Sequence, residues 1–346
     1  MFAKPTVFVI GAGASAEFGM PVGATLLSEV ANDLRKIENS DGPRSQELLR
    51  IFINASNNDN ARLNGLLDAA RQLARAMEIH PSIDEALHYF AGNADAIRAG
   101  KLAVALRIMS SEAKGKLPAS GNPDALAKFR PQANTWLYYF LSMLVAGTEL
   151  REDAPIFRNI TIVNFNYDRT VEHFLYHSLH NAAARSRETA ADSILRLEML
   201  RPYGRIGPLP WEKAKSRTVD FGETAAREAA VVEAANSIRT FTEQFSDDQL
   251  STRLRAALYE AKLVIFLGFG FHPQNMQLLQ LPNRREGGDP LILATKWAID
   301  EENDELIRRA IARALRTDSS SARLVNKRSV ELLRDLFPMI ALRVGR

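Results

Sequence analysis

An apolar run that leads directly into a glycine-rich turn limits the possible folds of this chain more than any other feature. Residues 7–10, VFVI, have the length of a strand without polar alternation, which is typical of a strand covered on both faces. Residues 11–16, GAGASA, follow at once, and a stretch with helical apolar spacing comes next. Gly11, Gly13 and Ala16 satisfy G-x-G-x-x-G/A, a pattern whose backbone amides bind a pyrophosphate. We predict a nucleotide-binding turn; a tight turn without a ligand is the alternative.

Further apolar runs of strand length, at residues 160–163, 263–267 and 291–294, each lead into a helical stretch. Strands that alternate with helices predict a parallel, doubly wound sheet, which binds ligands beyond the carboxyl ends of its strands. Residues 45–149 show only helical patterns, and the charged residues 182–246 are expected to be peripheral. The predicted fold is therefore α/β: a Rossmann-like doubly wound parallel sheet with an inserted all-helical sub-domain.

The order of these patterns also predicts the domain organisation. We expect a Rossmann-like domain formed by residues 1–40 and 156–300, a helical insertion at 41–155 and a basic C-terminal segment at 301–346. From Arg308 to the end, ten Arg and Lys residues face only three acidic ones, whereas the rest of the chain is slightly acidic. The basic segment predicts an assembly surface for an acidic partner or another subunit.

Composition excludes several kinds of site and location. The 346 residues include no cysteine, which rules out disulfides, thiolate zinc sites and cysteine nucleophiles. No run reaches the roughly 18 apolar residues that a membrane span needs. The short apolar run near the N-terminus is also below the length of a signal-peptide core, so we expect a cytoplasmic protein.

Several common motifs are absent or out of place. The sequence contains neither a Walker-type G-x-x-x-x-G-K-S/T nor a G-x-S-x-G motif. Asp33 has the spacing of the ribose-binding acid of dehydrogenases but lies in a helical pattern, which disfavours hydride transfer to nicotinamide. His173, His177 and His180 lie about one turn apart, but no H-E-x-x-H motif accompanies them. For these histidines we predict a solvated helix rather than a metal site.

Three motifs taken together resemble those of the sirtuin family. Residues 11–15, GAGAS, and 19–21, GMP, are similar to the sirtuin segments GAG-x-S and G-I-P. Residues 164–168, NFNYD, are similar to T-Q-N-I-D, whose Asn and Asp contact nicotinamide and ribose. Residues 268–270, GFG, fall where sirtuins have G-T-S near the adenosine ribose. The resemblance implies that NAD contacts Gly11, Ala12, Gly13, Ser15, Gly19, Pro21, Asn166, Gly268 and Phe269.

Other segments are similar to one branch, the sirtuin-like NAD hydrolases of bacterial anti-phage defence. These segments are Pro21-x-Gly23, SID at 82–84, NTW at 134–136 and Ala294-Thr295. The resemblance follows the chain in order over most of residues 5–300. It implies cleavage of NAD to nicotinamide and ADP-ribose, a homo-oligomer and a HerA-like ATPase as partner. Direct binding of nucleic acid is not expected, because Phe337 is the only aromatic residue in the basic run for bases to stack on.

The chain departs from the sirtuin pattern in two respects. Sirtuin deacetylases usually carry a four-cysteine zinc module, and a chain without cysteine has no such module, which argues against deacetylation and zinc. Tyr203, in the segment PYGRIG at 202–207, stands where the family has its catalytic histidine. Tyrosine, with an ordinary pKa near 10, is a poor base at neutral pH, and losing a general base typically lowers a rate by about 10²–10⁴. A hydrogen bond to a ribose hydroxyl is the role left open to Tyr203.

The candidate catalytic residues are Asn166, Asp168, Tyr203 and His272. Asn166 suits the ribose or a water because its amide both donates and accepts, and a turn is the alternative. Asp168 suits the nicotinamide amide or a positive charge, and a helix cap is the alternative. His272 either lines the pocket, supplies the missing base or simply begins a helix.

NAD hydrolysis is the function that we expect, with the chain as the toxic effector of an anti-phage complex and the helical insertion gating the pocket. Cleavage of the nicotinamide–ribose bond passes through an oxocarbenium-like state, as glycoside hydrolysis does. The alternative is a catalytically weak module that binds NAD or ADP-ribose and acts by assembly. A nucleic-acid-binding protein that uses the C-terminal arginines is the third possibility.

Overall fold

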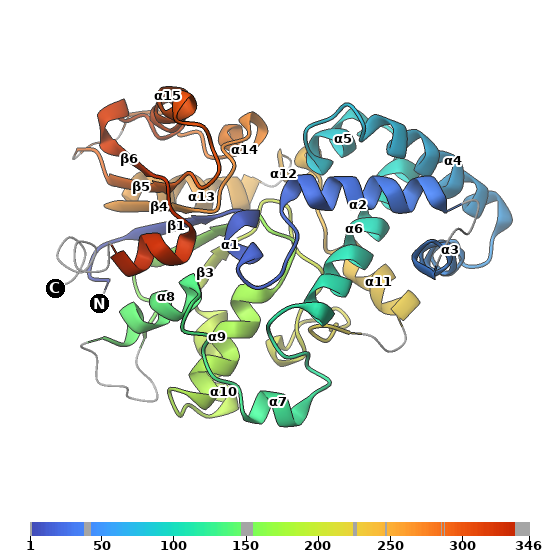
Figure 1. Cartoon of the computed structure of the whole chain (residues 1–346), viewed down its shortest axis with the longest axis horizontal. Coiled ribbons are helices and arrows are strands. Elements are labelled where there is room, and N and C mark those ends of the chain that lie inside the picture. The colour runs from blue at the N-terminus through green and yellow to red at the C-terminus, as the bar shows by residue number, and fades with distance from the viewer. Residues whose placement is uncertain are drawn as a thin grey trace.

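Six parallel strands form a single sheet in the order β3-β2-β1-β4-β5-β6 (Figure 1). The computed structural model of the chain describes residues 2–37, 43–146, 155–223, 227–245, 248–284, 286 and 288–335. The strands are β1 (Thr6–Ile10), β2 (Ile160–Asn164), β3 (Glu198–Leu200), β4 (Leu263–Leu267), β5 (Leu291–Thr295) and β6 (Ala322–Val325). This order is that of Rossmann folds, with the winding direction reversed between β1 and β4, and it confirms the predicted fold class.

Both faces of the sheet are covered, because the strands are apolar on both sides. Val7 and Val9 of β1 point into one core cluster, whereas Phe8 and Ile10 point into the other. Period-two alternation sends successive side chains to opposite faces, and all five residues of β1 are buried. The continuous apolar run in the sequence is thus explained by a doubly covered central strand.

Helices of the first core cluster cover the Val7 face and also extend beside the sheet. They are α2 (Gly23–Lys36), α3 (Pro43–Ala55), α4 (Asn60–Ala76), α5 (Ile83–Tyr89), α6 (Ala94–Lys114), α11 (Arg227–Asn236), α12 (Phe241–Phe245), α13 (Asp248–Glu260), α14 (Pro273–Leu278) and α15 (Asp304–Leu315). On the Phe8 face lie α8 (Trp136–Val145), α9 (Thr170–Asn181) and α10 (Arg187–Leu195). Figure 1 shows α14 and α15 on one side of the strands and α8–α10 on the other.

The short helices are α1 (Ala12–Ala16), α7 (Pro123–Ala127) and three 3₁₀ turns at Pro210–Glu212, Glu301–Asn303 and Ser319–Ser321. The predicted insertion is helical throughout its described part, but its helices serve both faces. Helices α2–α6 and α11 form a helical lobe beside the sheet (Figure 1), whereas α8 packs with α9 against the opposite face. Asp33 lies within α2 as predicted, where its buried carboxylate pairs with Arg107 of α6.

One expectation about the second half of the chain was wrong. Residues 182–246 are not peripheral, because they contain β3 and α11, and α11 packs against α3 and α6 of the helical lobe. Many of their charges are paired, which a composition argument cannot detect. The C-terminal segment, predicted to be a basic assembly surface, contains α15 and also β6, the edge strand that pairs with β5. The last residues of that segment, 336–346, lie outside the described part.

Candidate functional site

A pocket of about 840 Å³ lies at the carboxyl ends of the strands, across the point where β1 and β4 meet. Open α/β sheets bind ligands at this reversal of winding, and the volume lies within the roughly 300–1,000 Å³ of ligand pockets. The loops after β1, β2, β4 and β5 form its floor, and α5 and the segment after β6 contribute walls. The predicted residues that line it are Gly11, Ala12, Gly13, Pro21, Asn166, Asp168, Tyr203, Gly268, Phe269 and His272.

The glycines of the two central loops allow these loops to touch backbone to backbone. A Cβ atom on Gly11 would lie 2.6 Å from the carbonyl oxygen of Gly268, and one on Gly13 would lie 2.8 Å from the Cα of Gly268. Gly268 itself has a φ of +56°. The Gly13 amide donates to the Gly268 carbonyl over 2.9 Å. The motif therefore has a structural cause in this contact, and the Gly13 amide is already bonded within the protein.

Two of the residues expected at NAD lie outside the pocket wall. Ser15 is buried in α1, and its hydroxyl accepts a hydrogen bond of 2.8 Å from the side-chain amide of Asn166. Gly19, with a φ of +91°, forms the turn after α1 and lies next to Gly115. Ser15 thus orients a pocket residue from behind, and Gly19 shapes the turn that leads to Pro21.

Asn166 is held by its own amide nitrogen. This nitrogen donates to the carbonyl oxygen of Gly11 over 3.0 Å and to Ser15 Oγ over 2.8 Å, which uses both of its hydrogens. The backbone amide of Asn166 donates in turn to the side chain of Asn164, the last residue of β2. What Asn166 can offer to a ligand is therefore its side-chain oxygen, an acceptor suited to a hydroxyl group or a water.

Asp168 is buried and lines the pocket, and its side chain also binds the start of the following helix, although the N-cap residue of α9 is Arg169. One of its carboxylate oxygens accepts a hydrogen bond of 3.0 Å from the backbone amide of Thr170, at the start of α9. Such a contact satisfies an amide that has no partner within the helix. Asp168 is therefore fixed by the helix start and presents a rigidly held carboxylate to the pocket.

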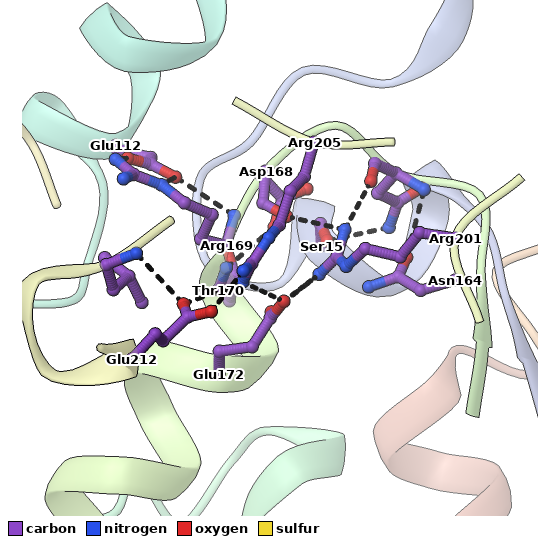
Figure 2. Close-up of polar contacts among 12 residues, drawn as sticks. Ser15, Glu112, Asn164, Asp168, Arg169, Thr170, Glu172, Arg201, Arg205 and Glu212 are labelled. Atoms are coloured by element: carbon purple, nitrogen blue, oxygen red, sulfur yellow. Dashed lines mark hydrogen bonds and ion pairs between the residues drawn. The ribbon is translucent and has the colours of Figure 1, made fainter. Parts of the chain in front are cut away.

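Arg201, which follows β3, holds the loop that carries both of these residues (Figure 2). Its guanidinium donates to the backbone carbonyl of Asn166 over 2.8 Å and to that of Asp168 over 3.2 Å. It also forms two bonds of 2.6 Å to the carboxylate of Glu172, which Arg205 contacts at 2.8 Å. Burial alone would raise the pKa of Glu172, but the two guanidinium groups reverse this and hold the pKa below its usual range. Nothing in the sequence had indicated Arg201 as part of the site.

A second buried ion pair joins the helical lobe to the same loop (Figure 2). Glu112 of α6 and Arg169 are fully buried and 2.6 Å apart, and the backbone amide of Arg169 donates to the same carboxylate over 3.0 Å. A further guanidinium bond of 2.9 Å reaches the carbonyl oxygen of Asp220. The pair thus ties α6, the start of α9 and the loop at Asp220 into one unit beside the pocket.

Tyr203 lies in the pocket wall with only 1% of its surface exposed. Its hydroxyl donates to the side-chain oxygen of Asn275 over 2.7 Å, and its ring packs against Phe165 at a centroid distance of 5.9 Å. Burial raises the pKa of Tyr203 above its ordinary value. The hydroxyl therefore stays protonated and acts as a donor, which agrees with the expectation that this tyrosine is not a base.

Asp84 is a pocket carboxylate to which the sequence had given no role. It lies in the first turn of α5, where the Ser82 side chain caps the helix, and it is partly exposed and lines the pocket. The hydroxyl of Tyr167, a residue of the loop after β2, donates to its carboxylate. Burial raises the pKa of Asp84 to about 6, although the bond from Tyr167 opposes this rise. The only sequence signal was the SID segment, which carried no functional assignment.

His272 lines the pocket and is also the N-cap residue of α14, so two of its alternative locations coincide. Its side chain makes no capping hydrogen bond within α14. Its Nε2 atom lies 3.6 Å from a carboxylate oxygen of Glu85, the residue after Asp84. His272 and α5 thus meet at one wall of the pocket.

The prediction of a solvated helix for His173, His177 and His180 was wrong. Every residue of α9 from Thr170 to Leu179 is buried. His173 stacks on Phe221 with a centroid distance of 3.9 Å, and its Nε2 atom lies 2.8 Å from the carbonyl oxygen of Pro118. Burial lowers the pKa of His173, and lowers that of His177 to about 4. Within the described part of the chain no group of side chains is arranged to hold a metal ion.

The opposite end of the pocket, toward β5 and β6, is basic. Lys116, Lys327 and Arg328 all line it, and the Arg328 guanidinium lies 4.7 Å from the ring centroid of Trp297, which is half exposed. The carboxylate of Glu17 joins the elements at this end by accepting the backbone amides of Trp136 and Val330, each over 2.8 Å. The pocket thus has two carboxylates and an amide near β2, and three cations with the single carboxylate of Glu17 near β6.

No protein-family model matches the chain, and no curated protein matches it. The resemblance to sirtuins therefore rests on the motifs described above. Across the residues that the structure describes, no helix is both long and apolar enough to span a membrane.

Proposed function

We propose that this protein is an NAD hydrolase, which cleaves the nicotinamide–ribose bond to give nicotinamide and ADP-ribose. The observation that carries this proposal is the pocket across the β1–β4 reversal, where the motifs that resemble sirtuin sequences converge. The loops that follow β1, β2 and β4 come from distant parts of the sequence, and each contributes such a motif to this pocket. Parallel strands bring these loops to one edge of the sheet, and most of the residues that the resemblance assigns to NAD line the pocket there.

The distribution of charge in the pocket suits NAD, because three cations outnumber the one carboxylate, that of Glu17, at the end toward β6. The nicotinamide ring of NAD is cationic, and its pyrophosphate is anionic. Asp84 and Asp168 lie on the β2 side of the pocket, and Lys116, Lys327 and Arg328 lie toward β6. Carboxylates near the scissile bond stabilise an oxocarbenium-like state, and cations bind phosphate oxygens. In this orientation the oxygen of Asn166 accepts a hydrogen bond from the ribose or from the attacking water.

The biological role and the partners of the protein are also proposals, and only the resemblance of the motifs supports them. They comprise an anti-phage role, a homo-oligomer and a HerA-like ATPase partner. Uncontrolled NAD hydrolysis kills the host cell, so we expect the isolated chain to turn over slowly.

Nicotinamide release by the purified full chain tests the proposed activity, with excess protein so that a single turnover is detectable. We expect release from the unaltered chain and its loss in Asn166→Ala, because this variant lacks the acceptor oxygen. Asn54→Ala, on the exposed side of α3, is the matched control and should release nicotinamide at the unaltered rate. Absence of release from the unaltered chain, alone or with an ATPase partner, would contradict the proposal.

A module that binds NAD or ADP-ribose without cleaving it is the second candidate. The observation in its favour is Tyr203, which occupies the place expected for a catalytic histidine and is held protonated. Calorimetry separates the two functions: tight NAD binding with no release of nicotinamide supports the binding module.

A further inference from the structure

NAD hydrolysis needs a group that takes a proton from the attacking water, and the expected residues do not provide one. Tyr203 stays protonated and donates to Asn275. The nitrogen of Asn166 has no hydrogen left to donate, and a neutral amide is not a base. The carboxylate of Asp168 is fixed by the backbone amide of Thr170, and its proposed role is to stabilise positive charge rather than to accept a proton. Of the other titratable groups in the pocket wall, His272 has its Nε2 atom 3.6 Å from a carboxylate oxygen of Glu85.

Asp84 differs from these residues in its surroundings. Its carboxylate is held by the hydroxyl of Tyr167, whose neighbours in the loop after β2 are Asn166 and Asp168. Asp84 is partly exposed as a residue and lines the pocket that would hold the ligand. Asp84 lies on α5, and its partner Tyr167 is buried beside Tyr203 at a ring distance of 6.3 Å. Through Asp84, the helical lobe thus places a carboxylate beside the loop that carries Asn166.

We infer that Asp84 is the general base of this site and that Tyr167 is its positioning residue. This inference rests on the proposed NAD hydrolysis. The bond from ribose C1′ to nicotinamide nitrogen breaks with its electron pair going to the nitrogen, so the nicotinamide leaves as a neutral ring. A water oxygen forms the new bond to C1′, and its proton passes to the carboxylate of Asp84, which releases it to solvent. The products are nicotinamide, ADP-ribose and one proton.

The ionisation of Asp84 suits this role. A general base is most effective when its pKa lies near the working pH, and burial raises that of Asp84 to about 6. The groups that interact with it electrostatically are the hydroxyls of Tyr167 and Tyr203. The helices packed against α5 also carry charged groups. Among these, Lys101 of α6 and Glu243 of α12 form an ion pair with each other. At neutral pH the carboxylate is therefore mostly ionised and ready to accept a proton.

The first test compares Asp84→Asn with the unaltered full chain in single-turnover nicotinamide release and in NAD binding by calorimetry. The amide has the same shape but cannot accept the proton, so we expect the rate to fall by about 10²–10⁴. The NAD dissociation constant should change by no more than a factor of about three, because a base acts on the reaction rather than on binding. Asp68→Asn, which removes an exposed carboxylate from α4, is the matched control and should leave the rate unchanged.

The second test uses the pH profile, which a merely structural role would not change. Release by the unaltered chain should decline as the pH falls through the pKa of Asp84. Tyr167→Phe removes the hydrogen bond that holds this pKa down, so the acidic limb of the profile should move to higher pH. The pH profile of Asp84→Asn should lack this acidic limb, because an asparagine side chain does not titrate.

The outcomes separate the role of Asp84 from the proposed function. If the unaltered chain releases nicotinamide and Asp84→Asn does so at the same rate and with the same acidic limb, the base is another group and NAD hydrolysis stands. If the unaltered chain releases none while still binding NAD, the proposed hydrolysis fails and the role of Asp84 fails with it.

Discussion

The guanidinium of Arg201 donates to the backbone carbonyl of Asn166 over 2.8 Å and so ties the loop after β3 to the loop after β2. The same group binds Glu172 in α9. An arginine can do both because its planar fork presents five donors in fixed directions. The position of Asn166 in the pocket therefore depends on a side chain that has no contact with the pocket itself.

Replacing Arg201 by Met removes these donors and leaves Glu172 with Arg205 as its remaining cation. We expect the free energy of unfolding to fall by about 1–3 kcal/mol, the usual cost of unsatisfied buried acceptors. Nicotinamide release should fall by about tenfold or more, because the Asn166 loop is no longer fixed. Urea denaturation and single-turnover assays measure the two effects. Arg35→Met, at an exposed ion pair, should change neither, and an equal loss there would contradict this role for Arg201.

The basic end of the pocket predicts selective effects on ligand affinity. Lys116→Gln and Arg328→Gln each remove a cation from this end. We expect each to weaken NAD binding by about tenfold, because hydrogen bonds to charged groups contribute about 1.5–3 kcal/mol. Nicotinamide riboside, which has no pyrophosphate, should bind the variants and the unaltered chain alike. Calorimetry with both ligands checks this, and equal weakening for both would place the pyrophosphate elsewhere.

Gly268→Ala should be strongly destabilising for reasons of backbone geometry. The new Cβ would lie 2.0 Å from the amide nitrogen of Ala14, and the residue has a positive φ. Strain of this kind costs about 1–3 kcal/mol, and overpacking adds to it. Gly270→Ala is the matched stability control, because a Cβ there has no neighbour within 4 Å. Thermal unfolding of the two variants measures the difference in stability. Equal unfolding midpoints would contradict the prediction, because they would mean that the loops after β1 and β4 can move apart at little cost.

The buried histidines predict acid sensitivity. Burial lowers the pKa of His177 to about 4, while the unfolded chain has the ordinary value near 6.5. Between these values the unfolded state binds the extra proton, so stability is lost as pH falls from about 6.5 toward 4, by up to about 1.4 kcal/mol per pH unit.

The raised pKa of Asp84 acts in the opposite direction, so the effect of His177 is isolated by comparison. His177→Phe should lose less stability than the unaltered chain over this pH range, as measured by urea denaturation at each pH. Identical slopes for the two proteins would mean that His177 is protonated in the folded state.

The sequence predicted those parts of the fold that depend on local pattern. Strands β1, β2, β4 and β5 are continuous apolar runs because helices cover both of their faces, and such runs are visible without a structure. The edge strands β3 and β6 are only three and four residues long, and neither forms an apolar run. They were missed because strand pairing, rather than composition, defines them.

The candidate site, like the fold, was predicted only in part from the sequence. Glycine and asparagine motifs at strand ends indicated most of the pocket floor, because parallel strands bring their carboxyl ends to one edge. Arg201 and Asp84 act through partners that are distant in the sequence, and no spacing rule relates Asp84 to Tyr167. His173 was misjudged for the same reason, since the aromatic ring that covers it belongs to residue Phe221.

The backbone contact between the loops after β1 and β4 also limits how the sequence of this protein can change during evolution. A methyl group at position 11, 13 or 268 would meet backbone atoms at 2.8 Å or less. Backbone atoms cannot be trimmed by a second substitution, so no single compensating change restores the fit. In proteins descended from this one, we expect these three glycines to be inherited as a set, or to be lost together when the backbone between β1 and β4 takes another path.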